Sequence, residues 1–334
     1  MSSSLTMIRS IAGIGLLGAT ALWSGTSCGQ DNKSLPEQIF ETMIQVPGYN
    51  PAFRAAHAKG VVCQGTFTAS KDAGSLSKAA HFQGGSIPVT VRFSDASPDP
   101  LVPDNAANPR GMAVRFRLPD GKETDIVALS HNGFIVGNGE DFLALQKAIV
   151  ATDPGKPHPW PIETFFGSHP LAAKFVQEIQ PVPVSYATQT FFSNDAFVFV
   201  SKQGVKQAGR YQILPVAGRQ NLSEADAKAK APNFLAEELK TRLASGPVQF
   251  RMIVQLPNAG DPTNDPSLVW PDDRKTIEVG MLSITSVAPD SDAAQKALVF
   301  FPTNLTDGIE LSDDPIPALR TSVYALSFAR RQQQ

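Results

Sequence analysis

Short segments in which apolar and polar residues alternate run through most of the chain. In "IPVTVRFS", Val91 and Phe93 point to one side of an extended backbone, while Arg92 and Ser94 point to the other. Strands are expected at 61–70, 87–94, 111–118, 124–129, 195–201, 209–215, 247–256, 276–286 and 297–301. Turn residues such as "PDGK", "SKQG" and "PNAG" separate them. This number of strands predicts an antiparallel sheet that closes into a barrel of about eight strands.

Other segments have the spacing of helices, and the fold class is therefore α+β. Helices are expected at 36–45, 139–151, 223–246 and 317–331, with Pro232 breaking the third. Two Pro-rich stretches, 152–163 and 257–271, are expected to be long surface loops. Because no linker or repeat interrupts the pattern, we expect one domain over 36–331.

The last of these helices, "PALRTSVYALSFARR", carries polar side chains on a face that its apolar neighbours suggest is buried. Arg320, Tyr324, Ser327 and Arg331 follow one another at helical spacing and share one side of the helix. A buried arginine requires an anion, because an uncompensated charge is costly to remove from water. The pattern therefore predicts an anion beside this helix.

Composition excludes some classes of function. The chain has 334 residues, 42% of them hydrophobic, and a net charge of −2, with no long basic stretch. We therefore expect no nucleic acid partner. No Cys, His, Asp and Glu spacing indicates zinc, and no glycine-rich phosphate loop, dinucleotide fingerprint or G-x-S-x-G motif is present.

The first residues differ from the rest of the chain. "MIRSIAGIGLLGATALW" has one arginine before an apolar run that is too short for a membrane span, and small residues follow it. We interpret 1–28 as a signal peptide and expect a periplasmic protein; a buried N-terminal helix is the alternative. Lipid anchoring at Cys28 is a weaker alternative, because Gly25 stands where lipoprotein signals usually have a branched aliphatic residue.

Individual polar residues have two interpretations each. The face that carries Arg92 and Ser94 is either an exposed sheet face or a polar pocket inside the barrel. His57, in "FRAAHAKG", is either a structural or exposed histidine or a catalytic one. Tyr324 is either a packed helix residue or, with Arg320 one turn earlier favouring its charged form, a phenolate ligand for ferric iron.

Five motifs occur together in the order in which haem catalases have them: "RAAHAKG", "VTVRFSDAS", "NPRGMAVRF", "TIEVGMLSIT" and "RTSVYALSFARR". The resemblance runs over 36–331. Because the chain is much shorter than a full catalase, it resembles the small catalase-related peroxidases of bacteria. The resemblance implies a catalase-like barrel with surrounding helices, a C-terminal helix that ligates the cofactor, and haem b with its iron as that cofactor.

The resemblance also implies roles for residues around the iron. His57 matches the distal histidine, and Ser94 matches the serine that orients it. Tyr324 matches the proximal iron ligand, and Arg320 matches the arginine that keeps this ligand a phenolate.

A second set of residues matches those that contact the rest of the haem. Arg54, Arg92 and Arg331 match the three arginines that bind the propionates. Phe142 matches a phenylalanine on the distal side. The anions expected beside the last helix are thus a phenolate and two propionates.

One position departs from the family. Leu129, in "DIVALS", stands where catalases have an asparagine that positions peroxide, and Ser130 follows it. We therefore expect a haem peroxidase that reduces hydrogen peroxide or organic hydroperoxides with a small-molecule electron donor and has weak catalase activity. If His57 is not the distal base, His131 is the next candidate on this segment.

Two alternative functions stay open. One is a hydroperoxide isomerase resembling allene oxide synthase, and the other is a non-enzymatic haem-binding protein. The expected partners are the peroxide and the donor, with no membrane span; a homodimer also stays open.

Overall fold

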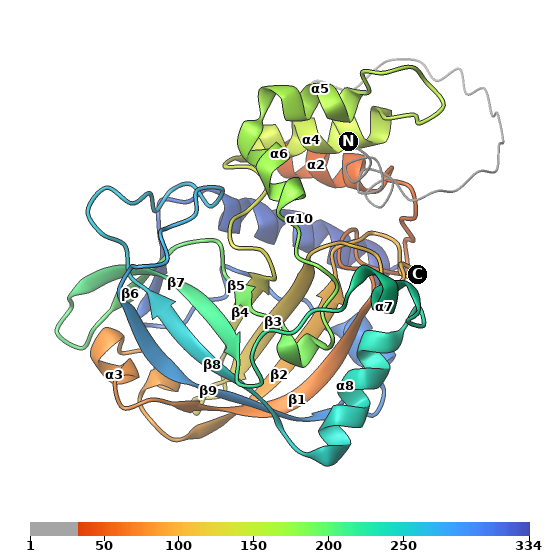
Figure 1. The fold of residues 1–334 in the computed structure, drawn as a ribbon. Coiled ribbons are helices and arrows are strands. Elements are labelled where there is room, and N and C mark those ends of the chain that lie inside the picture. Colours follow the sequence, from red (N-terminus) through yellow and green to blue (C-terminus); the bar gives the residue numbers. More distant parts are fainter. Residues whose placement is uncertain (1–32) are drawn as a thin grey trace.

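Eight antiparallel strands close into a barrel in the computed structural model, which describes residues 33–334 (Figure 1). They are β1 (Gly60–Ala69), β2 (Ser86–Asp95), β3 (Arg110–Arg117), β4 (Glu123–Leu129), β5 (Phe191–Phe192), β7 (Lys206–Pro215), β8 (Val248–Gln255) and β9 (Thr276–Val287). Their order is β7-β5-β4-β3-β2-β1-β9-β8, and pairing of β8 with β7 closes the ring. Outside the ring, β6 (Phe197–Val200) pairs with β7, and β10 (Ile309–Leu311) pairs with β6. The prediction of an α+β fold with an eight-stranded barrel is confirmed.

The interior of the barrel is apolar. Val91 and Phe93 of β2 are fully buried in it. The Phe93 ring lies 6.2 Å from the ring of Phe250 on β8, measured between centroids. Because β2 and β8 do not pair, this contact crosses the inside of the barrel. Full burial of such a side chain contributes roughly 2–3 kcal/mol, so the interior is the main source of stability.

The polar face of β2 therefore points outward. Arg92 and Ser94 lie on the outer surface of the barrel, yet each is buried. Both interpretations of this face from sequence are wrong, since it is neither exposed nor inside the barrel. A helix covers it from outside, and alternation alone cannot predict such a cover.

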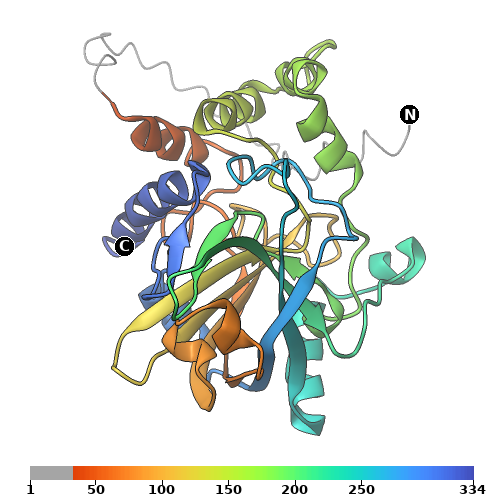
Figure 2. The ribbon, with the colours of Figure 1, turned by 90° about the vertical axis from the view of Figure 1, so that its left-hand side faces the viewer.

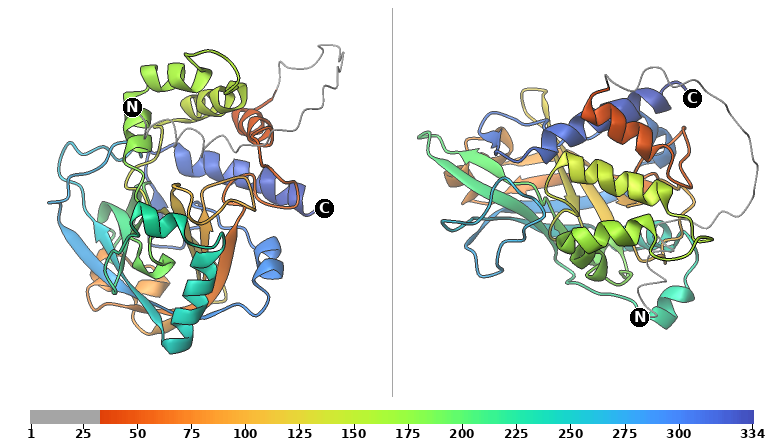
Figure 3. Two further views of the ribbon diagram at one scale, coloured as in Figure 1. Left: turned by 45° about the vertical axis from the view of Figure 1, so that its right-hand side comes forward. Right: turned by 90° about the horizontal axis from the view of Figure 1, so that it is seen from above.

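Helices form a layer over one side of the barrel. It contains α2 (Leu35–Met43), α4 (Gly139–Ala151), α5 (Pro161–Ser168), α6 (Pro170–Gln177) and α10 (Ile316–Arg331). Helix α2 packs against both α4 and α10. Figures 1 and 2 show α10 between the barrel and the other helices of this layer. Figure 3, seen from above, shows α2, α4 and α10 side by side over the barrel.

Other helices lie around the rest of the barrel: α3 (Ala73–Leu76), α7 (Glu224–Lys228), α8 (Phe234–Ser245) and α9 (Ser291–Ala297). Helix α9 packs against β1, where the Ser291 hydroxyl accepts a hydrogen bond from the Val62 N–H at 2.9 Å. The break expected at Pro232 is confirmed, since it falls between α7 and α8.

Local sequence explains where the site helices begin. Ser34 and Glu37 form a capping box at the start of α2, in which the Glu37 carboxylate accepts from the Ser34 N–H at 2.8 Å. At α10, the Asp314 carboxylate accepts from the Ile316 N–H at 2.9 Å, and Pro317 occupies the first turn, where its missing N–H costs nothing. The buried face of α10 includes Arg320, Ser327 and Arg331, as its spacing predicts.

Two expectations about local structure are wrong. No strand forms at 297–301, because the carbonyls of Leu298 and Val299 accept from arginine side chains rather than from a neighbouring strand. The stretch 152–163 is not a loop throughout, since α5 begins at Pro161, a residue that suits the first helical position. No helix described over 33–334 combines the length and apolar content needed to cross a membrane.

Candidate active site

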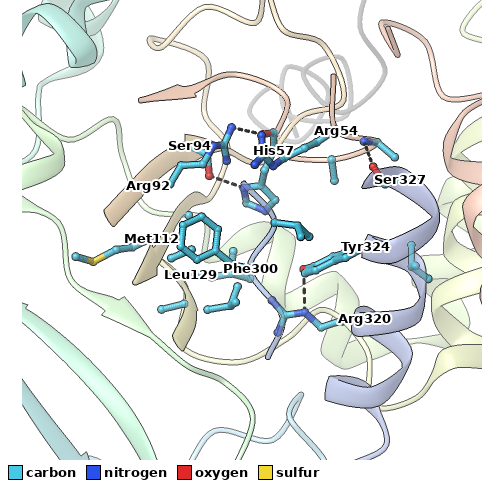
Figure 4. A pocket seen from close by; sticks show the side chains of 18 of the residues that line it. Arg54, His57, Arg92, Ser94, Met112, Leu129, Phe300, Arg320, Tyr324 and Ser327 are labelled. Atoms are coloured by element: carbon cyan, nitrogen blue, oxygen red, sulfur yellow. Dashed lines mark hydrogen bonds between the residues drawn. The ribbon is translucent and has the colours of Figure 1, made fainter. Parts of the chain in front are cut away.

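A pocket lies between the outer face of β2–β4 and helix α10 (Figure 4). Segment 54–57 and the residue pair 299–300 complete its wall. We call it the inner pocket. Its empty volume is about 700 Å³, a figure that includes open solvent at the entrance.

A second, more apolar pocket adjoins the first, and we call it the outer pocket. It extends between α4, α6, α10 and the loop 96–109. His57, Leu129 and Tyr324 line both pockets, so these residues lie where the two pockets adjoin. Phe142 of α4 lines the outer pocket only, where its ring lies 5.9 Å from that of Phe134.

His57 is held by its side chain and by its backbone. Its Nδ1 is 3.0 Å from the Ser94 hydroxyl oxygen, and its carbonyl accepts from Arg92 Nη2 at 2.8 Å. His57 has a φ of 55°, the only positive φ outside glycine among residues 33–334. Such a conformation costs about 1 kcal/mol or more and persists only where the surroundings impose it. The orientation of the ring is thus fixed where the two pockets adjoin.

The environment keeps the His57 imidazole neutral. Burial, and then the positive charges of Arg92, Arg320 and Arg54, lower its pKa to about 3. A neutral imidazole has a free nitrogen lone pair at physiological pH, and it can therefore accept a proton.

Gly111 on β3 makes room for the histidine. A Cβ atom at this position would lie 2.6 Å from the Ser94 hydroxyl oxygen and 2.8 Å from His57 Nδ1. Any side chain at 111 would therefore displace the pair. Gly111 lies inside "NPRGMAVRF", but nothing in the sequence alone indicated this role.

Three arginines of the inner pocket have only neutral oxygen partners. Arg54 Nη2 and Arg331 Nη2 both donate to the Leu298 carbonyl, at 2.6 and 2.5 Å. Arg92 donates to the His57 carbonyl and to the side-chain oxygen of Gln295. Within residues 33–334, none of the three forms an ion pair, whereas Arg110 pairs with Asp95 and Arg320 with Asp195. The pocket therefore holds three guanidinium groups without a counter-ion.

The pKa values of these arginines reflect that arrangement. Burial lowers the pKa of Arg92 and of Arg331 to about 10. The pKa of Arg54 also lies well below its ordinary value, because of burial and then of the charges of Arg92 and Arg331. The Nε of Arg331 is buried without a hydrogen-bond partner. A ligand with more than one negative charge would relieve all three groups at once.

Tyr324 and Arg320 form a connected pair on α10 (Figure 4). Arg320 Nε donates to the Tyr324 hydroxyl oxygen at 3.0 Å, and its Nη1 donates to Asp195 Oδ2 at 2.8 Å. Burial alone would lower the pKa of Arg320, but the charges of Tyr324 and Asp195 raise it above its ordinary value. The guanidinium therefore stays charged and points at the phenol oxygen.

The structure brings seven of the eight residues singled out from sequence to the inner pocket. They are Arg54, His57, Arg92, Ser94, Arg320, Tyr324 and Arg331. Phe142 is the eighth, in the outer pocket. Leu129 lines both pockets, while Ser130 accepts from the Arg110 N–H at 2.8 Å in the barrel wall. His131 lines neither pocket; its ring packs 4.0 Å from that of Phe175.

Sequence reasoning missed two residues that hold the arginines. Asp195 precedes β6 in the polar stretch "SND", and Gln295 lies on α9, both far along the chain from the groups they contact. Nothing in their local sequence signals either contact.

Comparisons with known proteins show the family of this chain. The model of the family described as Catalase matches residues 38–332. A catalase-related peroxidase of Mycolicibacterium paratuberculosis is 38% identical over 89% of this chain and 94% of its own length. A catalase-related peroxidase of Synechococcus elongatus is 35% identical over 89% of this chain and 88% of its own.

Solved structures share the fold. A bacterial catalase superposes with a TM-score of 0.75 at 22% identity, covering 96% of this chain and 64% of its own. A fungal catalase has the same TM-score, 0.75, at 20% identity, and this chain spans 59% of it. Since the family model spans nearly all of the described residues and two relatives exceed 30% identity over most of their length, this protein belongs to the catalase family.

Proposed function

We propose that this protein is a haem-dependent peroxidase that reduces hydrogen peroxide or organic hydroperoxides with electrons from a small-molecule donor. The observation that carries the proposal is the set of three arginines without counter-ions beside the Arg320–Tyr324 pair. The relatives named as catalase-related peroxidases support the same reading.

The residues present fit a haem. Tyr324 offers a phenol oxygen for the iron, and a phenolate is a known axial ligand of ferric haem. Arg54, Arg92 and Arg331 offer guanidinium groups for two propionates. Non-covalent haem b is favoured over a thioether-linked haem, because the one cysteine within residues 33–334, Cys63, is buried in the barrel core.

Each side chain then has one task. His57 accepts the proton of the hydroperoxide O–H and returns it to the oxygen that leaves, as general base and then acid. The hydrogen bond between Ser94 and His57 fixes the orientation of the imidazole ring. Arg320 donates a hydrogen bond to the Tyr324 oxygen that would ligate the iron. The redox chemistry, in which the O–O bond breaks and two electrons come from the donor, is supplied by the haem when it is bound. Overall, ROOH, two protons and two electrons give ROH and water.

Leu129 favours the donor-dependent reaction over dismutation. It lines both pockets beside His57 and carries no hydrogen-bonding group. A second peroxide therefore finds no hydrogen-bonding group at position 129 to orient it. The alternative of a non-enzymatic haem-binding protein is less well supported, since mere binding needs no oriented, neutral histidine. The alternative of a hydroperoxide isomerase is less well supported because the relatives are named as peroxidases.

A steady-state comparison tests the proposal. Purified haem-loaded protein receives hydrogen peroxide alone, with oxygen release measured, and then peroxide with a dye donor, with dye oxidation measured. We expect dye oxidation to be much faster than oxygen release. A lipid hydroperoxide supplied with the donor should give the alcohol. Formation of an epoxide without donor consumption would instead identify an isomerase, and no turnover at all would leave only haem binding.

Export is part of the proposal. The expected signal peptide at 1–28 lies outside the described residues, so its support is the apolar run after Arg9. Mass spectrometry of the protein from its native host should find a mature N-terminus near residues 25–30. An intact Met1 would rule out export by this signal, and a lipid on Cys28 would identify the lipoprotein alternative.

A further inference from the structure

The guanidinium of Arg92 has a partner on α9 that holds it without neutralising it. Arg92 Nε and Nη2 both donate to the side-chain oxygen of Gln295, at 3.1 and 2.9 Å. The amide nitrogen of Gln295 donates to Asp292 at 3.2 Å, which fixes the direction of the amide. A neutral oxygen therefore lies where two other buried arginines, Arg110 and Arg320, have a carboxylate.

The same Arg92 nitrogen also reaches the distal histidine. Nη2 donates to the His57 carbonyl at 2.8 Å, and His57 is the residue with the strained φ of 55°. Arg92 Nη1 makes no hydrogen bond within residues 33–334, and Arg92 lines the inner pocket. Nε and Nη2 of the guanidinium thus bind Gln295, and Nη2 also binds the His57 carbonyl. Nη1 is available to an anion in the pocket.

The position of Gln295 is itself fixed by the barrel. Helix α9 is tied to β1 by the hydrogen bond of Ser291 with Val62, and by the Ala288 N–H, which donates to the Val62 carbonyl at 2.8 Å. A carboxylate at 295 would form the same hydrogen bonds to Arg92 but would compete with an anionic ligand. An apolar side chain would form none of them.

We infer that Gln295 is a positioning residue: it aims Arg92 at an anionic group in the pocket, keeps its positive charge free for that group, and through Arg92 helps to hold His57 in its strained conformation. This inference rests on the proposed function, with a haem propionate as the anionic group. Its two parts, geometry and neutrality, are separable by substitution.

The test uses haem-loaded protein with the variants Gln295→Leu and Gln295→Glu. Two rates are measured for each: haem transfer to excess apomyoglobin, and peroxide consumption with a dye donor at full haem occupancy. For Gln295→Leu, we expect haem loss to become about tenfold faster and kcat/KM for peroxide to fall about tenfold, as for loss of one hydrogen bond to a charged group. For Gln295→Glu, we expect faster haem loss of about the same size, with kcat/KM within about threefold of the unchanged protein.

Gln332→Leu is the matched control. The Gln332 amide donates to the Lys296 carbonyl at 2.9 Å, so it contacts the same helix without contacting Arg92. It should leave both rates unchanged. Circular dichroism and the Tm of each variant show whether it has folded; if Gln295→Leu does not fold, Gln295→Glu still decides the question, because it retains the acceptor.

Three outcomes are distinguishable. If the unchanged protein takes up no haem, the proposed function fails and this inference fails with it. If it takes up haem but both Gln295 variants match it in both rates, only the inference is overturned. If Gln295→Glu shows the faster haem loss and also the same fall in kcat/KM as Gln295→Leu, Gln295 is merely part of the packing, and the claim that its neutrality matters is overturned.

Discussion

Arg320 and Tyr324 lie one helical turn apart on α10, and the Nε of Arg320 donates to the Tyr324 oxygen at 3.0 Å while its Nη1 is bound to Asp195. The arginine therefore cannot turn away from the phenol without breaking a buried ion pair. Charge at the phenol oxygen is stabilised by a donor that is already in place. This pair supports Tyr324 as the iron ligand and leads to the first prediction.

Tyr324→Phe should remove haem binding, because it deletes the one oxygen proposed to bind the iron. We expect haem content after reconstitution to fall to a small fraction of that of the unchanged protein. Absorbance of the ferric protein and the haem-to-protein ratio measure this. Tyr49→Phe is the control, since Tyr49 packs in the cluster between α2 and α10 and lines neither pocket. Full haem content and an unchanged spectrum in Tyr324→Phe would assign the ligand elsewhere.

His57→Ala should keep the fold and the haem but lose the proton transfer. General acid–base groups contribute about 10²- to 10⁴-fold, so kcat/KM for peroxide should fall by that factor. Ser94→Ala should give a smaller decrease, because it removes only the hydrogen bond that orients the ring. The measurement is initial rate against peroxide concentration at equal haem occupancy. A haem-loaded His57→Ala protein with an unchanged rate would show that another group transfers the proton.

Leu129→Asn should shift the balance of activities towards dismutation. The amide would place a hydrogen-bonding group beside His57, where a second peroxide needs orientation. We expect the ratio of oxygen release to dye oxidation to rise about tenfold, as for one added hydrogen bond in a buried site. Leu129→Val, which changes the side-chain volume without adding a polar group, is the control. An equal rise in both variants would attribute the effect to space rather than to hydrogen bonding.

His81→Leu should stabilise the protein against acid. His81 is buried among Phe67, Phe82 and Phe116, and neither of its ring nitrogens has a hydrogen-bond partner. Burial lowers its pKa to about 3. Between about pH 6.5 and pH 3 the unfolded chain therefore binds a proton that the folded protein does not. As the pH is lowered through this window, the unfolding free energy falls by about 1.4 kcal/mol per pH unit.

The difference in unfolding free energy between His81→Leu and the unchanged protein should therefore grow as the pH falls through that window. Urea titrations of the protein without haem at pH 7, 6 and 5 would measure it. Removing the unpartnered ring should also stabilise the variant by about 1–3 kcal/mol at pH 7. A difference that stays constant with pH would mean that His81 is protonated in the folded protein.

Sequence patterns predicted the strands and helices of this fold better than they predicted what packs against each one. Alternation in β2 separated Phe93 from Arg92 correctly, because side chains on successive strand residues point to opposite faces. It could not say that the polar face is covered by α10, since that depends on packing between distant parts of the chain. The segment at 297–301 has the composition of a strand, yet the arginines that bind its carbonyls come from 54, 115 and 331.

In the candidate site, too, sequence predicted residues within local motifs but not contacts between distant segments. The residues that match family motifs, such as His57 and Tyr324, were found because the motifs name them. Asp195 and Gln295 were not found, because each acts through one arginine that lies distant in sequence. Gly111 has its role only because Ser94 and His57 approach it from other segments.

The hydrogen bond from the Ala55 N–H to the Ser327 hydroxyl, 3.1 Å long, joins positions 272 residues apart. It places the first wall of the pocket, at 54–57, against the last helix of the chain. A nascent polypeptide that is still leaving the ribosome has the histidine but neither the tyrosine nor the third arginine. Capture of the proposed haem must therefore wait until α10 has been synthesised and has packed against segment 54–57, so haem uptake would itself report that these two distant segments have met.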